Sequence, residues 1–351
     1  MTRVLVAMSG GVDSSVTAAL LLQLGHDVVG ATMKLWGGPS DSGCCSVADV
    51  EDARRVCQQL GIAHHVFNFT SDFERAVVGP YVRAHSEART PNPCIACNTH
   101  LKFDRFLERG LQLGFEAIAT GHHARVTRSG ADGSYQLRRG RDANKDQSYV
   151  LYMLGQHQLA HLRLPVGEMT KQEVRDLAAS LGLRTATKPD SQDVCFISRV
   201  GGRESFLRDR TSLGPGKLVS GEGEDLGAVE ALELVTVGQR RGLGLSAGSL
   251  HERRYVVDVD LVGRKATLGH LEDLMVGSVR LTDICWSDRP AAPGTRTSAQ
   301  LSAHGTPVPA TWQPPEVVFD EPARKVAPGQ AVVLYETGGY GDRVLGGGTA
   351  T

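Results

Sequence analysis

Apolar and polar positions alternate in blocks over the first third of the chain, as in proteins where each strand leads into a helix. Apolar, β-branched runs predict strands over Val4–Met8, Asp27–Met33, His64–Phe69 and Ala117–Thr120. The amphipathic segments between them predict helices over Asp13–Leu24, Glu51–Leu60, Asp72–His85 and Asn98–Leu113. This alternation is typical of an α/β fold with a doubly wound parallel sheet, whose ligands bind beyond the carboxyl ends of the strands.

Beyond residue 120 the pattern predicts a more mixed structure. Alternation about a glycine turn in Ala124–Leu137 predicts a β-hairpin. Helices are predicted over Asp146–Leu154 and over Thr170–Leu181, the second of which opens with a Thr-x-x-Glu capping box.

Near Ser212 glycine becomes frequent and the helical period fades. Short β-type runs follow over Leu232–Val237, Tyr255–Val259 and Ala266–Leu268. From Val276 onward, short strands separated by Pro and Gly turns predict a small β-barrel. We therefore expect a parallel-sheet domain over 1–205, a small mixed or β central domain over 206–275, and a C-terminal β-barrel domain over 276–351.

Composition narrows the class of protein. The chain has 351 residues, of which 41% are hydrophobic and 22% charged, as in globular proteins. It contains no apolar run long enough to span a membrane and no signal-peptide pattern, and its seven clustered cysteines indicate a reducing compartment, so we expect a cytoplasmic protein. The net charge of −1 gives no overall basic excess for nucleic acid, but basic residues cluster at Arg138–Lys145, Arg240-Arg241 and Arg253-Arg254.

The stretch Ser9-Gly10-Gly11-Val12-Asp13-Ser14 joins the first strand to the first helix. Paired glycines let a ligand approach the backbone, and the first amides of a helix favour an anion. The stretch matches neither Gly-x-x-x-x-Gly-Lys-Ser/Thr nor Gly-x-Gly-x-x-Gly, which excludes two common phosphate loops. A glycine turn that serves packing alone is the alternative, but we favour a phosphate site. The residues at neighbouring strand ends that we expect around it are Met8, Met33, Thr120, Gly121 and His122.

Two further segments carry cysteines in unusual settings. Thr90–Asn98 is a proline-stiffened loop with a Cys-x-x-Cys pair, whose second cysteine, Cys97, directly precedes the predicted N-cap Asn98. A helix N-terminus lowers the pKa of a thiol. Asp190–Ile197 places Cys195 in a second loop. These residues alone leave open half of a zinc site, a redox pair, a three-thiolate iron–sulfur site, and a pair of sulfur-carrying and resolving cysteines.

These motifs, taken in order, resemble those of the bacterial tRNA-specific 2-thiouridylases, a family of PP-loop ATP pyrophosphatases. The matched segments span nearly the whole chain and are Met8–Ser15, Thr32–Lys34, Thr90–Asn98, Thr120–His122, Lys145–Leu151, Asp190–Ile197, Thr236–Gly244, Pro328–Gln330 and Leu345–Gly348. In that family ATP adenylylates O2 of the wobble uridine of tRNA and releases pyrophosphate. A cysteine persulfide then delivers sulfur to C2, which gives 2-thiouridine and AMP. The resemblance therefore implies a tRNA-uridine 2-sulfurtransferase.

The resemblance also implies roles for individual residues. Those that would bind ATP are Ala7, Met8, Ser9, Gly10, Gly11, Val12, Asp13, Ser14, Met33 and Gly121. Those that would face the target base are Asn92, Pro93 and Cys94, and those that would contact tRNA are His122, Lys145, Asp146, Gln147 and Gln330. Cys195 would carry the persulfide, and Cys97 would be its catalytic partner, with a transient disulfide between the two.

The implied cofactor is ATP with Mg²⁺, and the implied partners are tRNA and a persulfide sulfur donor; we expect a monomer without membrane contact. Cys94 stands where many members of the family have Asp, and with Cys97 and Cys195 it makes up a potential [4Fe–4S] site. The same reaction with such a cluster is therefore an alternative. A more distant one is a PP-loop ligase or amidotransferase acting on a small metabolite, which would leave Cys97 and Cys195 unexplained. The sequence assigns no role to Cys44 and Cys45.

Overall fold

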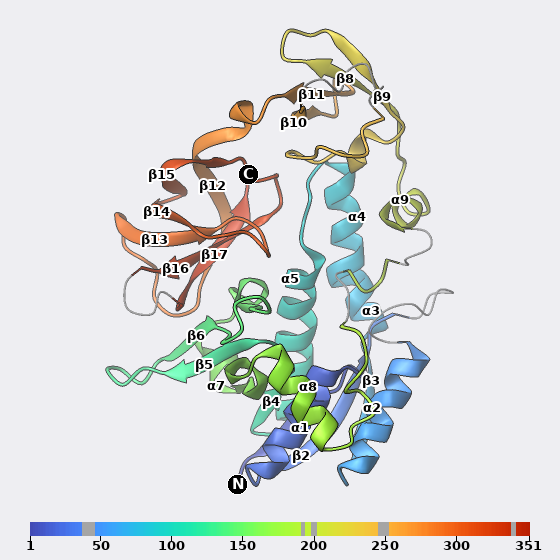
Figure 1. The fold of residues 1–351 in the computed structure, drawn as a ribbon, viewed down its shortest axis with the longest axis vertical. Coiled ribbons are helices and arrows are strands. Elements are labelled where there is room, and N and C mark those ends of the chain that lie inside the picture. Colours follow the sequence, from blue (N-terminus) through green and yellow to red (C-terminus); the bar gives the residue numbers. More distant parts are fainter. Residues whose placement is uncertain (37–45, 191–193, 198–201, 245–252, 338–341) are drawn as a thin grey trace.

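The computed structural model describes residues 1–36, 46–190, 194–197, 202–244, 253–337 and 342–351, and these fold into three parts along the chain (Figure 1). Cys44 and Cys45 lie outside these residues. The first part is built on a five-stranded sheet, the second on a four-stranded sheet, and the third is a closed barrel. The predicted order of parallel sheet, small β-rich part and barrel is confirmed.

The sheet of the first part is doubly wound and parallel, as predicted. Its strands are β1 (Arg3–Ala7), β2 (Asp27–Lys34), β3 (His64–Asn68), β4 (Ala117–Ala119) and β7 (Leu162–Arg163). They lie in the order β3-β2-β1-β4-β7, and every neighbouring pair is parallel. Because side chains alternate across a strand, Val4 and Val6 join one apolar cluster, and Leu5 and Ala7 join another on the opposite face.

Helices cover both faces of this sheet. The cluster that contains Val4 and Val6 also takes residues from α1 (Val12–Gln23), α2 (Val47–Gln59) and α8 (Lys171–Ser180). The other face is covered by two long helical stretches: α3 (Thr70–Phe73), η1 (Glu74–Val78) and α4 (Gly79–Ser86), then α5 (Pro93–Cys97), η2 (Asn98–Phe106) and α6 (Leu107–Gln112). No helix in these described parts of the chain has the length and apolar character to cross a membrane.

The second of these stretches corrects the predicted helix over Asn98–Leu113. It begins at Pro93, because Asn92 is the N-cap and its Oδ1 accepts a hydrogen bond from the amide of Cys94 at 3.0 Å. Cys97 therefore lies inside the helix and is buried, instead of preceding the helix start. The thiol in the first turn of this helix is that of Cys94.

The predicted helix over Asp146–Leu154 is also wrong, since only the 3₁₀ turn η3 (Ser148–Leu151) forms. The carboxylate of Asp146 accepts hydrogen bonds from the amide and the hydroxyl of Ser148, at 3.0 and 2.9 Å. Such side-chain bonds compete with helical ones. The other elements of this part are the predicted hairpin, β5 (Ala124–Arg128) and β6 (Tyr135–Arg139), then α7 (Gln156–Ala160), η4 (Pro165–Glu168) and α9 (Gly202–Arg208).

The second part is a small sheet in the order β10-β11-β8-β9. Its strands are β8 (Gly216–Ser220), β9 (Asp225–Val229), β10 (Tyr255–Asp260) and β11 (Lys265–Gly269), of which the sequence predicts only the last two. The strand predicted over Leu232–Val237 is wrong, because Leu232–Leu234 forms a 3₁₀ turn, η5. Leu232 and Val235 are still buried in the apolar cluster of this sheet, because a turn can bury these side chains as well as a strand can.

The third part is the predicted β-barrel. Its strands are β12 (Met275–Trp286), β13 (Thr295–Gln300), β14 (Val308–Gln313), β15 (Glu316–Arg324), β16 (Ala331–Glu336) and β17 (Val344–Ala350), closed in the order β12-β15-β14-β13-β16-β17. The barrel docks on the first part through Tyr335, which is fully buried. Its hydroxyl lies 3.0 Å from Ser148 Oγ, and the guanidinium of Arg139 lies 3.6 Å from the centroid of its ring.

The carboxylate of Asp342, next to β17, binds two arginines of the hairpin, Arg125 and Arg138, and is almost buried. Asp342→Ala should lower the free energy of unfolding by about 2 kcal/mol, because both partly buried guanidinium groups lose their carboxylate partner. Asp320→Ala, which breaks an exposed pair with Arg296, is the matched control and should lower the free energy of unfolding much less. Urea unfolding of the two variants tests this, and equal losses would contradict it.

Candidate functional site

The glycine stretch after β1 forms a loop that leads into the N-terminus of α1. Gly10 has φ of +71°, a conformation that favours glycine, and Gly11 is the N-cap of α1 without a side chain to cap it. Ser14 Oγ accepts from the amide of Ser9 at 3.2 Å and donates to the carbonyl of Gly11 at 3.1 Å. The loop, hereafter the phosphate loop (residues 9–15), is therefore shaped by its own hydroxyl groups around the N-terminus of α1.

The ends of β2 and β4 meet this loop, as expected from a parallel sheet. A Cβ atom at Gly121 would lie 2.7 Å from the amide nitrogen of Ser14 and 2.8 Å from Asp13 C, so only glycine fits there. On the other side, Met8 donates its amide to the carbonyl of Ala31 at 2.8 Å. Met33, the other predicted nucleotide contact, is buried near the end of β2.

Two basic side chains that the sequence analysis does not single out hold Asp13. The ammonium group of Lys171, at the start of α8, lies 2.8 Å from both carboxylate oxygens, and Nε2 of His123 lies 3.2 Å from Oδ1. Burial raises the pKa of Asp13, but the hydrogen bonds from His123 and Lys171 outweigh it and hold this pKa below its usual range. Asp13 is thus a carboxylate held by an ammonium group and an imidazole.

The segment that leads toward Cys195 lies against the same loop. Thr185 donates its hydroxyl to Ser15 Oγ at 3.0 Å. Lys188 donates to the carbonyl of Gly10 at 2.9 Å and to carboxylates of α2, those of Asp49 and Asp52, at 2.7 Å each. The loop is therefore held from one side by α8 and from another by residues 185–188.

The cysteines predicted to react are placed by apolar packing. Cys97, from α5, is buried in the large cluster on one face of the sheet, and Cys195 packs against the same cluster. Phe196 is buried there as well, with its ring centroid 5.4 Å from that of Tyr81. Cys94 is partly exposed in the first turn of α5.

All three parts of the chain meet at Thr90, just before the predicted base-facing residues 92–94. Thr90 donates its amide to the carbonyl of Pro328 in the barrel at 2.8 Å, and its hydroxyl to Thr236 Oγ1 in the second part at 3.3 Å. A Cβ atom at Gly329 would lie 3.1 Å from the amide nitrogen of Thr90. Gln330 is thereby placed close to the segment that leads into Asn92.

The residues predicted to contact tRNA differ in exposure. Lys145 and Gln147 are exposed, Asp146 and Gln330 are partly buried, and His122 is buried. Burial holds the pKa of His122 well below its usual value, so its imidazole is neutral near pH 7. Its Nδ1 lies 2.7 Å from Thr120 Oγ1.

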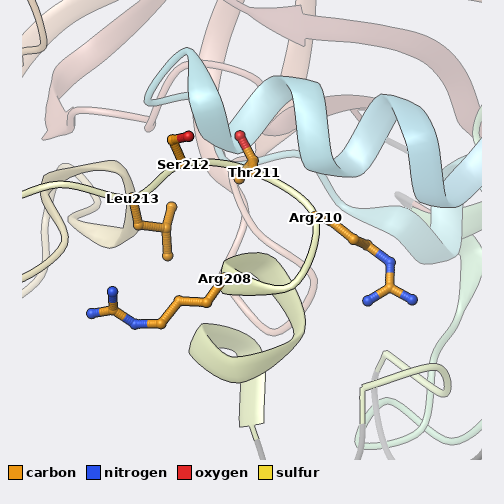
Figure 2. A pocket seen from close by; sticks show the side chains of 5 residues that line it. All are labelled: Arg208, Arg210, Thr211, Ser212 and Leu213. Carbon is orange, nitrogen blue, oxygen red and sulfur yellow. The ribbon is translucent and has the colours of Figure 1, made fainter.

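A pocket of about 510 Å³ lies where α9 leads into the second part, away from the phosphate loop. It is lined by Arg208, Arg210, Thr211, Ser212 and Leu213 (Figure 2). The two guanidinium groups point in different directions in Figure 2. Arg208 is paired with Glu204 at 2.7 Å, and Arg210 lies 4.0 Å from the ring centroid of Phe206. The pocket therefore contains none of the predicted site residues and does not focus its two charges on one point.

The described residues do not fit a metal cluster. Among them, no three His, Cys, Asp or Glu side chains come together as a metal-binding group. The predicted trio of Cys94, Cys97 and Cys195 therefore does not form a three-thiolate site in this arrangement, and we derive no step through a [4Fe–4S] cluster.

The fold and the site define a class of protein: it has a nucleotide-binding loop on a parallel sheet and two accessory β domains. Three family profiles match in the same order: "tRNA methyl transferase HUP domain" over residues 2–199, "tRNA methyl transferase PRC-barrel domain" over 204–268 and "Aminomethyltransferase beta-barrel domain" over 276–350.

Proteins similar to nearly the whole chain identify its family within this class. A tRNA-specific 2-thiouridylase MnmA of Chloroflexus aurantiacus is 46% identical over 360 residues, which cover 99% of this chain and 98% of the relative. The proteins of the same name from Herpetosiphon aurantiacus and Carboxydothermus hydrogenoformans are each 44% identical, over 99% of this chain and 98% and 97% of their own. The chain is therefore an enzyme of the tRNA-specific 2-thiouridylase family.

A solved structure described as "Crystal structure of a 4-thiouridine synthetase - RNA complex with bound ATP" is 17% identical, with a TM-score of 0.37 over 56% of this chain and 45% of that chain. This likeness is too low to support an inference about function.

The contacts of Asp13 predict how stability depends on pH. Its folded-state pKa lies below the unfolded value of about 3.9, so its stabilising effect is complete above about pH 4 and is lost as the pH falls through the folded pKa. Asp13→Asn should therefore lower the free energy of unfolding at pH 7 and make it less steep in pH below about pH 4. Asp176→Asn, at an exposed site on α8, is the control. Urea unfolding at pH 7 and below about pH 4 measures the free energy of unfolding of each variant. Parallel pH profiles for wild type and Asp13→Asn would contradict the prediction.

Proposed function

We propose that the chain is a tRNA-uridine 2-sulfurtransferase that uses ATP to convert the wobble uridine of tRNA into 2-thiouridine. ATP with its Mg²⁺ binds to the phosphate loop, to residues 7 and 8 before it, and to Met33 and Gly121. O2 of the uracil attacks the α-phosphorus, and pyrophosphate leaves. Adenylylation is needed because the oxygen at C2 is a poor leaving group until it carries the nucleotide.

Sulfur transfer then uses two cysteines. The outer sulfur of a persulfide on Cys195 attacks C2, and AMP leaves with the former uracil oxygen. The thiolate of Cys97 attacks Sγ of Cys195, so a disulfide forms between the two cysteines while the bond from Cys195 to the transferred sulfur breaks, and its electron pair stays on that sulfur. An external thiol reduces the disulfide, and a persulfide donor reloads Cys195.

The RNA approaches from the side of the cysteines. Asn92, Pro93 and Cys94 face a base flipped out of its stack, since chemistry on a nucleobase requires access to the whole ring edge. The other contacts to tRNA come from His122, Lys145, Asp146, Gln147 and Gln330. We propose that the enzyme works as a monomer in the cytoplasm.

One observation supports this proposal most. The segment before Cys195 is hydrogen-bonded to the phosphate loop through Thr185 and Lys188, and Cys195 and Cys97 pack in one cluster. ATP activation and sulfur delivery at one base need both groups in a single site. A ligase acting on a small metabolite has no use for this arrangement of the two cysteines.

The roles of the cysteines predict separable defects. Cys195→Ala should lower tRNA thiolation by at least about 100-fold, because the persulfide has no carrier, while tRNA-dependent exchange of pyrophosphate into ATP continues. Cys285→Ala, a partly buried cysteine in β12, is the matched control and should keep both activities. Full thiolation by Cys195→Ala would refute the persulfide assignment.

Iron and sulfide analysis after anaerobic purification tests the alternative with an iron–sulfur cluster. A colourless, iron-free preparation that thiolates tRNA would exclude that alternative.

The close contact at Gly121 predicts a defect in nucleotide binding. Gly121→Ala places a methyl group against the backbone of Asp13 and Ser14 and should weaken ATP binding by about tenfold or more. Gly130→Ala is the control, because a Cβ atom there meets nothing within 4 Å. Calorimetric titration with ATP measures both variants. Unchanged affinity in Gly121→Ala would show that this contact does not shape the nucleotide site.

A further inference from the structure

Asp190, five residues before Cys195, is surrounded by three cationic side chains. The ammonium groups of Lys145 and Lys171 each lie 2.9 Å from one of its carboxylate oxygens, and Arg175 donates to it at 2.6 Å. Burial raises the pKa of Asp190, but hydrogen bonds from the two lysines hold it well below its usual range. The carboxylate is therefore a charged anchor for the chain that continues to Cys195.

Lys171 is the member of this group that also contacts the phosphate loop. Its ammonium group lies 2.8 Å from both oxygens of Asp13 and 2.9 Å from Asp190, and its side chain is only 12% exposed. One partly buried cation thus bridges two carboxylates that lie on separate functional segments. A partly buried charge of this kind is held strongly by its partners, because water screens it little.

We propose that Lys171 is a positioning residue that shares its charge between Asp13 and Asp190, and so couples nucleotide occupancy of the phosphate loop to the reactivity of Cys195. The inference rests on the proposed use of ATP at this loop. It extends that proposal, because it assigns a link between the two half-reactions to one side chain.

The physical basis is competition for one ammonium group. A triphosphate at the phosphate loop adds negative charge beside Asp13 and draws Lys171 toward it. Asp190 then keeps only Lys145 and Arg175, so its contact with α8 changes.

Downstream of Asp190 the chain is held by a second, apolar anchor. The ring centroid of Phe196 lies 5.6 Å from that of Phe73 and 5.2 Å from that of Phe206. Between the two anchors, Val194 has φ of +57°, a conformation that is strained for a β-branched residue. Cys195 therefore lies between Asp190 and Phe196 in the chain, and we expect a change in the contacts of Asp190 to alter the setting of its thiol.

The test is the rate at which iodoacetamide alkylates Cys195 in the reduced full-length protein, followed by mass spectrometry of the peptide that carries it. The rate is measured with and without α,β-methylene-ATP, which cannot be cleaved between its α and β phosphates. In wild type the analogue should change the rate by about fivefold, the lower end of typical coupling between two sites. In Lys171→Met and in Asp190→Asn the ratio should fall to near one.

Two controls keep the result interpretable. Asp190→Asn leaves the contact between Lys171 and Asp13 in place, so it should still bind the analogue in a calorimetric titration even if Lys171→Met does not. Arg184→Met removes an ion pair of 3.0 Å between Arg184 and Asp52 of α2, and should keep the wild-type ratio. Binding of the analogue to wild type without a change in rate would overturn this inference alone, as would a wild-type ratio in Asp190→Asn. Failure of wild type to bind the analogue would overturn the proposed use of ATP as well.

Discussion

The ammonium group of Lys171, held between the carboxylates of Asp13 and Asp190, joins three distant stretches of the chain. Asp13 belongs to the phosphate loop, Lys171 begins α8, and Asp190 precedes Cys195 by five residues. Each of these charges is partly withdrawn from water, so each depends on partners of opposite charge or on hydrogen bonds. Because α8 packs on α1, the fold of the first part brings Lys171 to the phosphate loop.

Close backbone contacts at two glycines also hold the parts of the site together. Gly121 brings the end of β4 against the phosphate loop, and Gly329 brings the barrel against Thr90. The second part reaches the same point through Thr236. Both accessory parts thus contact the residues just before Asn92. In the proposed function, these contacts fix the edge of the site at which the base of the RNA binds.

Sequence alone predicts the local features well and the long-range ones poorly. The parallel sheet, the barrel and the phosphate loop follow from periodicity and glycine placement within short windows. Lys171 and Asp13 are 158 positions apart, and no local pattern marks Lys171 as a partner of the loop. The start of α5 is a different case: Asn92 followed by Pro93 is a typical helix start, but Asn98 offers a competing N-cap, and only the fold decides between them.

We propose that the phosphate loop and the cysteines form one site for ATP-dependent thiolation of a tRNA uridine. The decisive measurement is nucleoside analysis of tRNA after incubation with the enzyme, ATP and a persulfide source. We expect 2-thiouridine at the wobble position, with AMP and pyrophosphate formed in equal amounts, and no product when ATP is omitted. Unmodified tRNA under these conditions, or thiolation that proceeds without ATP, would contradict it.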